Sequence, residues 1–153
     1  TDITCFNLSE QIRSCILLLD TKWEKKQLNF ALDFDEYYIE ANEELLKQVF
    51  INLVDNAIKF SENGGSVDIS IENEDDSILV SVSNYGKEIL PEQKQKIFNK
   101  FYQADESHSS EGYGVGLAIV KKIVMLHNGN VFVESKNGRT TFTVILPQNI
   151  TTE

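Results

Sequence analysis

The stretch LKQVFINLVDNAIKF, residues 46–60, decides the fold of this 153-residue chain. Its apolar residues recur every three or four positions, which predicts an amphipathic helix ending near residue 60. Asn42 can cap the start of that helix through its side-chain oxygen. Gly64-Gly65 marks the turn that follows. One side of this helix is therefore expected to enter a core.

The opposite side of the helix carries three polar residues, Asn52, Asn56 and Lys59, at positions i, i+4 and i+7 of one face. An amide oxygen is a hard, neutral ligand that suits Mg²⁺. A lysine ammonium supplies a positive charge for phosphate oxygens. By themselves these residue types also suit a face that simply meets water, so the pattern needs support from elsewhere in the chain.

The rest of the chain alternates helical and strand patterns. Helices are expected at 8–25, 91–101 and 117–127, and the strands are expected at 27–33, 37–41, 67–71, 79–82, 131–134 and 141–146. The acidic run at 72–76 is expected to be a solvated hairpin tip. Helices interleaved with hairpins predict an α+β fold: a two-layer α/β sandwich whose mixed, mostly antiparallel sheet is covered on one face by helices. We expect residues 1–153 to form a single domain.

Composition narrows the function classes. The formal net charge of −10 argues against a nucleic-acid partner, which requires a basic surface, but it leaves room for a nucleotide bound by a few local donors. We find no apolar run of about 20 residues and no signal-peptide pattern. The two cysteines, Cys5 and Cys15, are expected to be reduced thiols.

A glycine-rich segment directly precedes the last predicted helix: Gly112-Tyr113-Gly114-Val115-Gly116-Leu117. Glycines let a backbone approach phosphate closely, and a helix N-terminus favours an anion. The spacing differs from the dinucleotide fingerprint, and a polar stretch replaces the strand that the fingerprint requires. Two further segments attract attention, residues 84–89 after a predicted strand and the aromatic residues within 97–102. Core packing alone could explain those aromatic residues.

Taken in order, these segments resemble the boxes of sensor histidine kinases. Residues 46–60 resemble the N box, residues 84–89 the first glycine box, 98–102 the F box and 112–117 the second glycine box. The end of the chain, residues 141–147, is similar to the last strand of that family. The resemblance covers nearly the whole chain. It implies the Bergerat ATP-binding fold, which gyrase-type ATPases, Hsp90 chaperones and MutL repair proteins share.

The resemblance also implies roles for individual residues. Asn56 would coordinate Mg²⁺, and Asn52 and Lys59 would support the phosphates, so these three are the expected catalytic residues. Phe60 would pack near the adenine, and residues 99–111 would form a lid over ATP. The expected ATP-binding residues beyond those four are Asn84, Gly86, Ile89, Tyr102, Gly112, Tyr113, Gly114, Val115, Gly116, Leu117 and Thr141.

One position distinguishes between relatives that share this fold, and two others depart from the family pattern. ATP-hydrolysing members carry a glutamate, the general base, at the position of Asn52; an amide does not accept a proton at neutral pH. The resemblance therefore implies a kinase rather than a gyrase-like or chaperone-like ATPase. In the first glycine box, Asn84 replaces an aspartate and Glu88 replaces a glycine. Losing charge assistance at Asn84 predicts weaker ATP binding and predicts that Asn84→Asp tightens it.

The altered first glycine box also motivates a second hypothesis, a degenerate regulatory module with weak or no kinase activity. A third is a serine kinase of the anti-sigma type, which shares the Bergerat site. Serine-bearing and histidine-bearing acceptors would distinguish the two kinases.

The phosphorylated histidine is expected to lie on another segment or chain. His108 falls in the presumed lid, and His127 ends a helix, where a structural role is expected. The resemblance implies a dimerisation domain of the same kinase as partner, and a response-regulator receiver domain that takes the phosphoryl group from its histidine. It places this chain in the cytoplasmic portion of a membrane-bound bacterial sensor kinase. The fragment is expected to be monomeric and unable to autophosphorylate alone.

Overall fold

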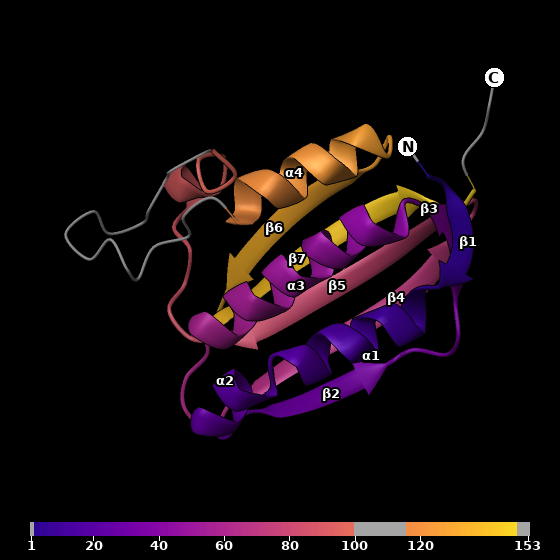
Figure 1. The fold of residues 1–153 in the computed structure, drawn as a ribbon. Helices are drawn as coiled ribbons and strands as arrows, with labels where there is room; N and C mark the ends of the chain where they lie inside the picture. Colours follow the sequence, from indigo (N-terminus) through magenta and orange to yellow (C-terminus); the bar gives the residue numbers. More distant parts are fainter. Residues whose placement is uncertain (1, 100–115, 150–153) are drawn as a thin grey trace.

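A five-stranded sheet forms one layer of the molecule, and helices cover one of its faces (Figure 1). The computed structural model describes residues 2–99 and 116–149. Only the first strand pair of the sheet is parallel, and the other neighbours are antiparallel. The predicted fold class is therefore confirmed. In spatial order the strands are β2 (Asn29–Asp33), β4 (Ser66–Glu74), β5 (Ser77–Tyr85), β7 (Arg139–Pro147) and β6 (Asn130–Lys136).

The helices α1 (Leu8–Leu18), α3 (Glu43–Lys59) and α4 (Gly116–Leu126) lie side by side on that face, with α3 in the middle (Figure 1). The expected helix over 8–25 is interrupted at Leu19 and resumes as α2 (Asp20–Lys25). The Trp23 indole N–H donates to the Ile16 carbonyl at 2.8 Å. This bond gives a partner to a carbonyl in the last turn of α1, where carbonyl groups lack the usual helical donors. The helix expected over 91–101 is not formed in the described residues: Pro91–Gln93 form a 3-10 turn, and residues 94–98 continue as turns.

A second, two-stranded sheet joins β1 (Thr4–Asn7) to β3 (Tyr38–Ala41). The sequence prediction missed β1, because its four residues are too few for a period-two pattern and its partner lies about 35 residues away along the chain. Strand β2 begins later than expected because Gln27 has a positive φ of 56°. The acidic run does form a hairpin tip, with Asp75 at φ 57° between β4 and β5.

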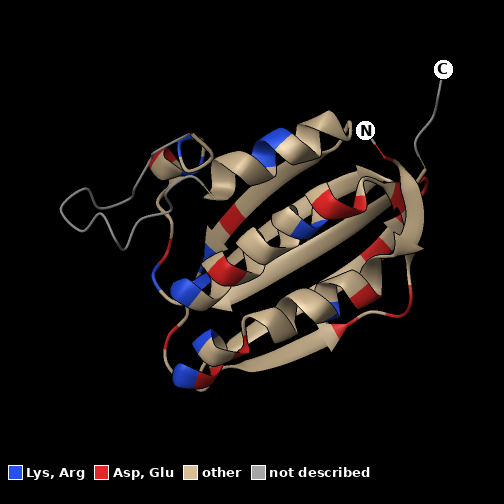
Figure 2. Cartoon of the chain, viewed as in Figure 1, with Lys and Arg blue, Asp and Glu red and all other residues tan. Residues whose placement is uncertain are grey.

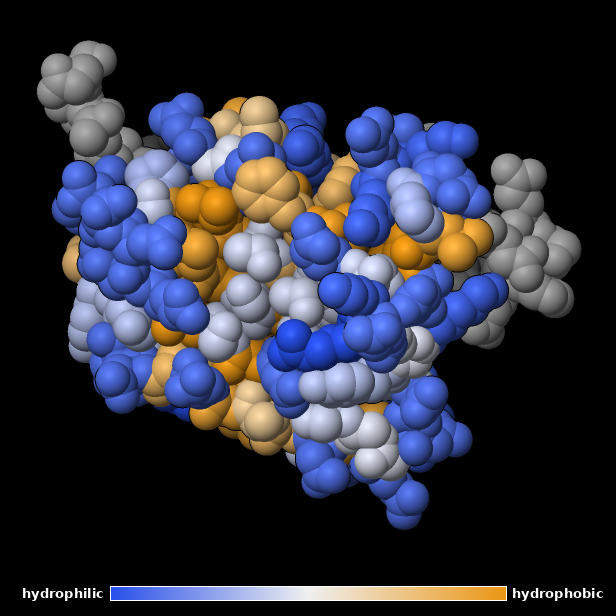
Figure 3. Space-filling model, turned by 180° about the vertical axis from the view of Figure 1, so that it is seen from behind, coloured by the Kyte–Doolittle hydropathy of each residue, from blue (hydrophilic) through white to orange (hydrophobic). Residues whose placement is uncertain are grey.

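The apolar sides of the helices and the inner face of the sheet form the core. Alternate residues of β4, such as Val67 and Ile69, point into it and are at most 1% exposed. Figure 3 shows the opposite, uncovered side, with pale and orange side chains across its middle and hydrophilic residues around them. That side has a shallow hollow of about 460 Å³ lined in part by Ser81, Ser83 and Thr141. No described helix has the length and apolar character needed to cross a membrane.

Both cysteines are free thiols. Cys15 is completely buried in α1, and this burial raises the pKa of its thiol to about 11. The Cys15 thiol therefore stays protonated at neutral pH and behaves as a small core residue.

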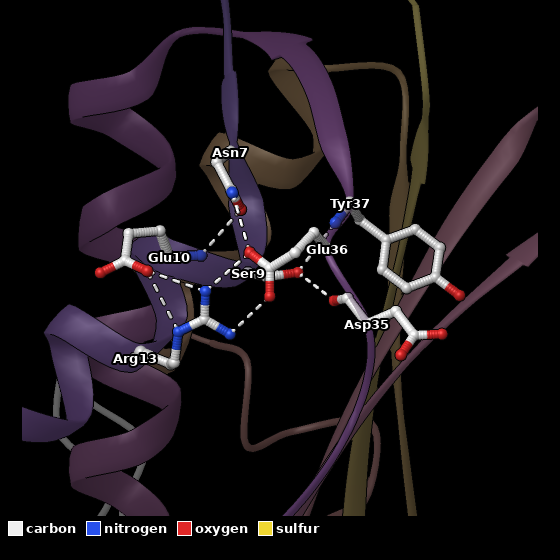
Figure 4. Close-up of polar contacts among 7 residues, drawn as sticks. All are labelled: Asn7, Ser9, Glu10, Arg13, Asp35, Glu36 and Tyr37. Atoms are coloured by element: carbon white, nitrogen blue, oxygen red, sulfur yellow. Dashed lines mark hydrogen bonds and ion pairs between the residues drawn. The ribbon is translucent and has the colours of Figure 1, made fainter.

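The start of α1 is tied to the loop between β2 and β3 by a charged network (Figure 4). The Arg13 guanidinium donates to both Glu36 carboxylate oxygens, at 3.0 and 2.7 Å, and also to Glu10. The Asn7 amide donates to Glu36 at 2.9 Å while its oxygen caps α1 by accepting from the Glu10 N–H. The hydrogen bonds from Arg13 and then Asn7 lower the pKa of Glu36.

A buried hydroxyl supports the same junction. Ser9 Oγ donates to the Asp35 carbonyl at 2.6 Å and accepts the Tyr37 N–H at 2.9 Å. Ser9 is fully buried, so both bonds are shielded from water.

We expect Glu36→Gln to lower the thermal unfolding midpoint slightly at pH 7. The midpoint of this variant should also fall less than that of the wild type when the pH is lowered from 7 to 3. Because the pKa of Glu36 is lower in the folded protein than in the unfolded chain, its ion pair stabilises the fold above the unfolded-state pKa. That contribution is lost as the pH falls through the folded-state pKa. Thermal melts from pH 7 to pH 3 measure the effect. Glu24→Gln, at an exposed position of α2, is the control, and equal pH profiles for both variants would contradict the assignment.

Candidate functional site

The polar face of α3 lies opposite the start of α4. Asn52 and Asn56 are half-buried and Lys59 is exposed. The Asn52 amide nitrogen donates to the Gln48 carbonyl at 2.9 Å. A Cβ atom added at Gly116 would lie 3.0 Å from Asn52 Oδ1, so α4 begins directly against this amide. The structure thus brings Asn52 to the N-terminus of α4, where backbone N–H groups favour an anion.

Asn56 offers a side-chain oxygen that could bind Mg²⁺ together with a ligand. In the described ranges, the Asn56 side chain forms no hydrogen bond within the protein, which leaves its amide oxygen available. Those ranges also contain no cluster of three His, Cys, Asp or Glu side chains able to hold a metal. Mg²⁺ commonly takes one or two protein oxygens and fills its shell with water and phosphate. A single amide oxygen fits that pattern.

Basic residues gather at the end of the molecule where α3 stops (Figure 2). The Lys59 ammonium lies 5.7 Å from the centre of the Phe60 ring. Lys26, which follows α2, donates from its Nζ to the carbonyls of Ile58 and Lys59, both at 2.9 Å. The ammonium of Lys26 therefore serves carbonyls at the negative end of the helix. Sequence reasoning missed this residue because its partners lie more than 30 positions away.

The sheet contributes Asn84, at the end of β5, to the site. Asn84 is 3% exposed, and its amide nitrogen donates to the Phe60 carbonyl at 3.2 Å. Gly86 follows, and a Cβ there would stand 2.3 Å from the same carbonyl oxygen, so no other residue fits without moving the backbone. This glycine is therefore needed for the close approach of two backbone segments.

The segment after Gly86 is fixed to the hairpin of β6 and β7. The Gly86 N–H donates to the Gly138 carbonyl at 2.8 Å. The Ile89 N–H donates to Ser135 Oγ at 2.8 Å, and the Ile89 side chain is buried. Glu88 accepts the Gly138 N–H at 3.0 Å. The carboxylate that replaces a glycine in this box is therefore directed to the hairpin turn.

Thr141 does not join the other predicted residues. Its side chain lines the hollow on the uncovered face of the sheet, where its hydroxyl lies 2.7 Å from Ser83 Oγ. Its neighbour Thr140 is paired with Asn84 in the register of β5 and β7, and it is 5% exposed on the helix side. The alternation of β7, in which Phe142 and Val144 are buried, predicts that Thr140 faces the helices and that Thr141 faces away from them.

Leu117 is also placed differently from the expectation. Its side chain is 1% exposed within the core, so it packs α4 on the sheet. Gly116, in contrast, opens α4 beside Asn52 as described above. Tyr102, Gly112, Tyr113, Gly114 and Val115, with His108, lie outside the described residues.

His127 joins the end of α4 to the start of α3. Its Nε2 accepts the backbone N–H of Asn42 at 3.2 Å, which requires the neutral tautomer with a proton on Nδ1. Nδ1 lies 2.9 Å from the Ile123 carbonyl and donates to it. The expected structural role is confirmed, but through hydrogen bonds of a neutral, buried ring. Both helices that border the site are thus connected at their far ends.

Comparison with known proteins gives a consistent result. Residues 41–150 match the model of the family described as histidine kinase-, DNA gyrase B- and HSP90-like ATPases. The chain is similar to the heme sensor protein HssS of Staphylococcus aureus, with 36% identity over 127 residues, which cover 82% of this chain and 27% of HssS. This chain therefore spans about a quarter of the length of that relative.

Solved structures agree. The catalytic domain of the histidine kinase ThkA superposes with a TM-score of 0.88 at 32% identity, covering 99% of this chain and 100% of that domain. The structure of ThkA in complex with the response regulator protein TrrA superposes with a TM-score of 0.79 at 31% sequence identity. The match covers 95% of this chain and 42% of that one. Full-length ShkA in complex with AMPPNP superposes with a TM-score of 0.83 at 25% sequence identity. The match covers 95% of this chain and 31% of that one.

We expect Lys26→Met to lower the free energy of unfolding by about 1–2 kcal/mol, because two carbonyls lose a charged donor. Lys22→Met is the matched control. Its ammonium pairs with Asp55 at 2.8 Å on the surface, where an ion pair contributes about 0–1 kcal/mol. Urea unfolding of both variants measures the difference. Equal losses would show that the carbonyl contacts of Lys26 contribute nothing beyond a surface pair.

Proposed function

Because this chain belongs to the family of histidine kinase-, DNA gyrase B- and HSP90-like ATPases, we propose that it binds Mg-ATP and donates the γ-phosphate to a histidine on a separate dimerisation domain. It would act as the catalytic domain of a two-component sensor kinase. The observation that carries this proposal is Asn52, an amide on the α3 face where a hydrolytic enzyme needs a base.

The described residues divide into a phosphate part and a base part. Asn52, Asn56 and Lys59 on α3 would face the phosphates, with Asn56 as the protein ligand of Mg²⁺. A bound Mg²⁺ would neutralise phosphate charge and orient the phosphate chain. Asn84 would meet the adenine from the sheet side of the site, and Gly86 and Ile89 would shape the base pocket.

The proposed reaction is transfer to nitrogen rather than to water. The bond between the γ-phosphorus and the bridging oxygen of ADP would break, a bond from the acceptor imidazole nitrogen to phosphorus would form, and a base on the acceptor's own domain would take the imidazole proton. The amide of Asn52 cannot take a proton from water, and its nitrogen is already engaged with Gln48. Catalysis by this chain would therefore consist of positioning and charge neutralisation.

The acceptor histidine would come from outside the described part of this chain. Both ring nitrogens of His127 are engaged in hydrogen bonds within a buried site, which argues against it as a phosphate acceptor. The likeness to HssS, of which this chain spans about a quarter, supports a longer parent protein. The structure of ThkA with TrrA supports a response-regulator receiver domain as the next acceptor.

The regulatory-module hypothesis is motivated by Asn84 and Glu88, and the geometry weakens it. Glu88 is held at the hairpin turn by Gly138, and Asn84 keeps an acceptor oxygen. Nothing in the described site therefore blocks a base. Offering this chain a histidine-bearing helical domain and, separately, a serine-bearing partner distinguishes a histidine kinase from a serine kinase, because phosphohistidine is lost in acid and phosphoserine is not.

We expect calorimetric titration with a non-hydrolysable ATP analogue to show binding that depends on Mg²⁺, and we expect Asn56→Ala to abolish that dependence. The amide oxygen is the proposed metal ligand, so its loss removes the contact between protein and metal. Asn29→Ala, at an exposed position of β2, is the control and should bind normally. No binding to the wild type at millimolar analogue would reject the proposed function in favour of the regulatory module.

Asn84→Asp should bind ATP more tightly than the wild type, because a charged acceptor makes roughly twice as strong a hydrogen bond to the adenine amino group. The same substitution should lower the thermal midpoint, because a carboxylate oxygen would then face the Phe60 carbonyl now served by the amide. Calorimetry and thermal melts on one preparation measure both effects. Unchanged or weaker affinity would refute the adenine contact.

A further inference from the structure

A second hollow lies between the N-terminal halves of α1 and α3. It has a volume of about 330 Å³, at the lower end of the roughly 300–1,000 Å³ of ligand pockets. Its lining includes Gln11, Ser14, Glu43, Glu44 and Lys47. Lys59, at the other end of α3, lies about 24 Å away along the helix axis. The hollow is therefore separate from the proposed nucleotide site.

The side chain of Gln11 is the unusual feature of this hollow. Gln11 is 9% exposed, and its amide nitrogen donates to the Glu43 carbonyl at 2.9 Å. A carbonyl oxygen only accepts hydrogen bonds, so the amide end that faces it is the NH₂ group. The other amide atom, Oε1, is buried and accepts no hydrogen bond from any residue in the described ranges. A buried acceptor without a donor is costly, so this oxygen calls for a donor from outside those residues.

Three carboxylates line the same hollow, and one of them is already paired. Glu10 accepts from the Arg13 guanidinium at 2.8 Å (Figure 4). Glu43 and Glu44 are exposed in the first turn of α3 and form no ion pair within residues 2–99 and 116–149. The helix dipole alone explains acidic residues in a first turn. It does not explain a buried amide oxygen beside them, which is an independent observation.

A monovalent cation with several N–H donors fits both features. One donor would serve Gln11 Oε1, and the others would serve the carboxylates of Glu43 and Glu44. A guanidinium has five N–H donors in a planar fork and keeps its charge at neutral pH. Counting Arg13 and Lys47 against the three carboxylates leaves one negative charge, which one guanidinium neutralises. A metal ion fits less well, because no group of three His, Cys, Asp or Glu side chains in the described ranges is placed to hold one.

We infer that this hollow binds the guanidinium of an arginine residue on a protein partner. Ser14, Glu44 and Lys47 at its rim are exposed, so their side chains can change rotamer and uncover Gln11 Oε1 without a movement of either helix. A free small cation would keep much of its surface in water in so open a hollow. A partner chain covers the rim as it delivers the side chain, and this gives the burial that ligand sites require.

The experiment titrates the nitrogen-15-labelled protein with a blocked pentapeptide that has a central arginine. The matched probe has citrulline, the neutral isostere of arginine, and the third probe is methylguanidinium alone. We expect the arginine peptide at millimolar concentration to give saturable shifts of the Gln11 side-chain amide and of the Ser14 and Glu44 backbone amides. Its affinity should exceed that of each other probe at least about tenfold, because charged donors make the stronger hydrogen bonds.

Each alternative has its own outcome. Equal binding of the citrulline peptide would overturn the guanidinium assignment, and equal binding of methylguanidinium would overturn the protein partner as its source. If the arginine peptide shifts none of these resonances, the whole inference is wrong, while the proposed nucleotide site is unaffected.

Variants locate the contact within the hollow. Gln11→Met removes the buried oxygen at similar volume and should weaken the arginine peptide at least about tenfold. Gln48→Met, at an exposed position of α3 outside the hollow, is the matched control and should bind as the wild type does. Glu44→Gln changes an exposed residue and keeps the test open if Gln11→Met does not fold. It should weaken the arginine peptide about two- to fivefold and leave the citrulline peptide unchanged, and an unchanged arginine affinity in either folded variant would contradict the site.

Discussion

The carbonyls at the end of α3 are the constraint around which the site is arranged. A helix leaves its last carbonyl groups without partners inside the helix, and this end lies among neighbouring segments where such groups need donors. Lys26 serves two of them, the Ser61 hydroxyl serves Ala57, and the Asn84 amide serves Phe60. The need to supply donors to these carbonyls brings together three segments of the chain, represented by Lys26, Ser61 and Asn84. The same contacts hold the residues proposed to meet the nucleotide.

Helix α3 is also fixed at its other end and along its side. Asn42 caps it by accepting the Leu45 N–H, and His127 accepts the Asn42 N–H from the end of α4. Helix α4 starts against Asn52 and ends at this cap. The two helices therefore pack side by side between these two points. A protonated His127 could not accept that N–H, so the neutral ring is part of the packing between the helices.

The sequence predicts most of the fold because its signals are local. The period of α3, its Asn42 cap and the Asn137-Gly138 turn, with φ of 57° and 78°, each depend on a few neighbouring residues. Strand β1, the break at Leu19 and the role of Lys26 depend on partners distant along the chain, which no local pattern reports. Thr141 lies on the uncovered face of the sheet and Thr140 on the helix side, a difference that follows from the pleat of β7 but not from the family motif.

The three amides of the site, Asn52, Asn56 and Asn84, have a common electrostatic consequence. This chain carries a net charge of −10, and the phosphates of a nucleoside triphosphate are strongly anionic, so a carboxylate in place of Asn52 or Asn56 would be costly. The nearby acids are engaged elsewhere: Asp55 pairs with Lys22, and Glu88 accepts from the hairpin turn. A neutral amide at position 84 forgoes the charge assistance of an aspartate but adds no negative charge, and it satisfies the Phe60 carbonyl, which an aspartate cannot do. With asparagine at position 84, the proposed hydrogen bond to the adenine is weaker than with aspartate. In return, the amide makes a second hydrogen bond, to the Phe60 carbonyl, and this bond fixes the orientation of the side chain.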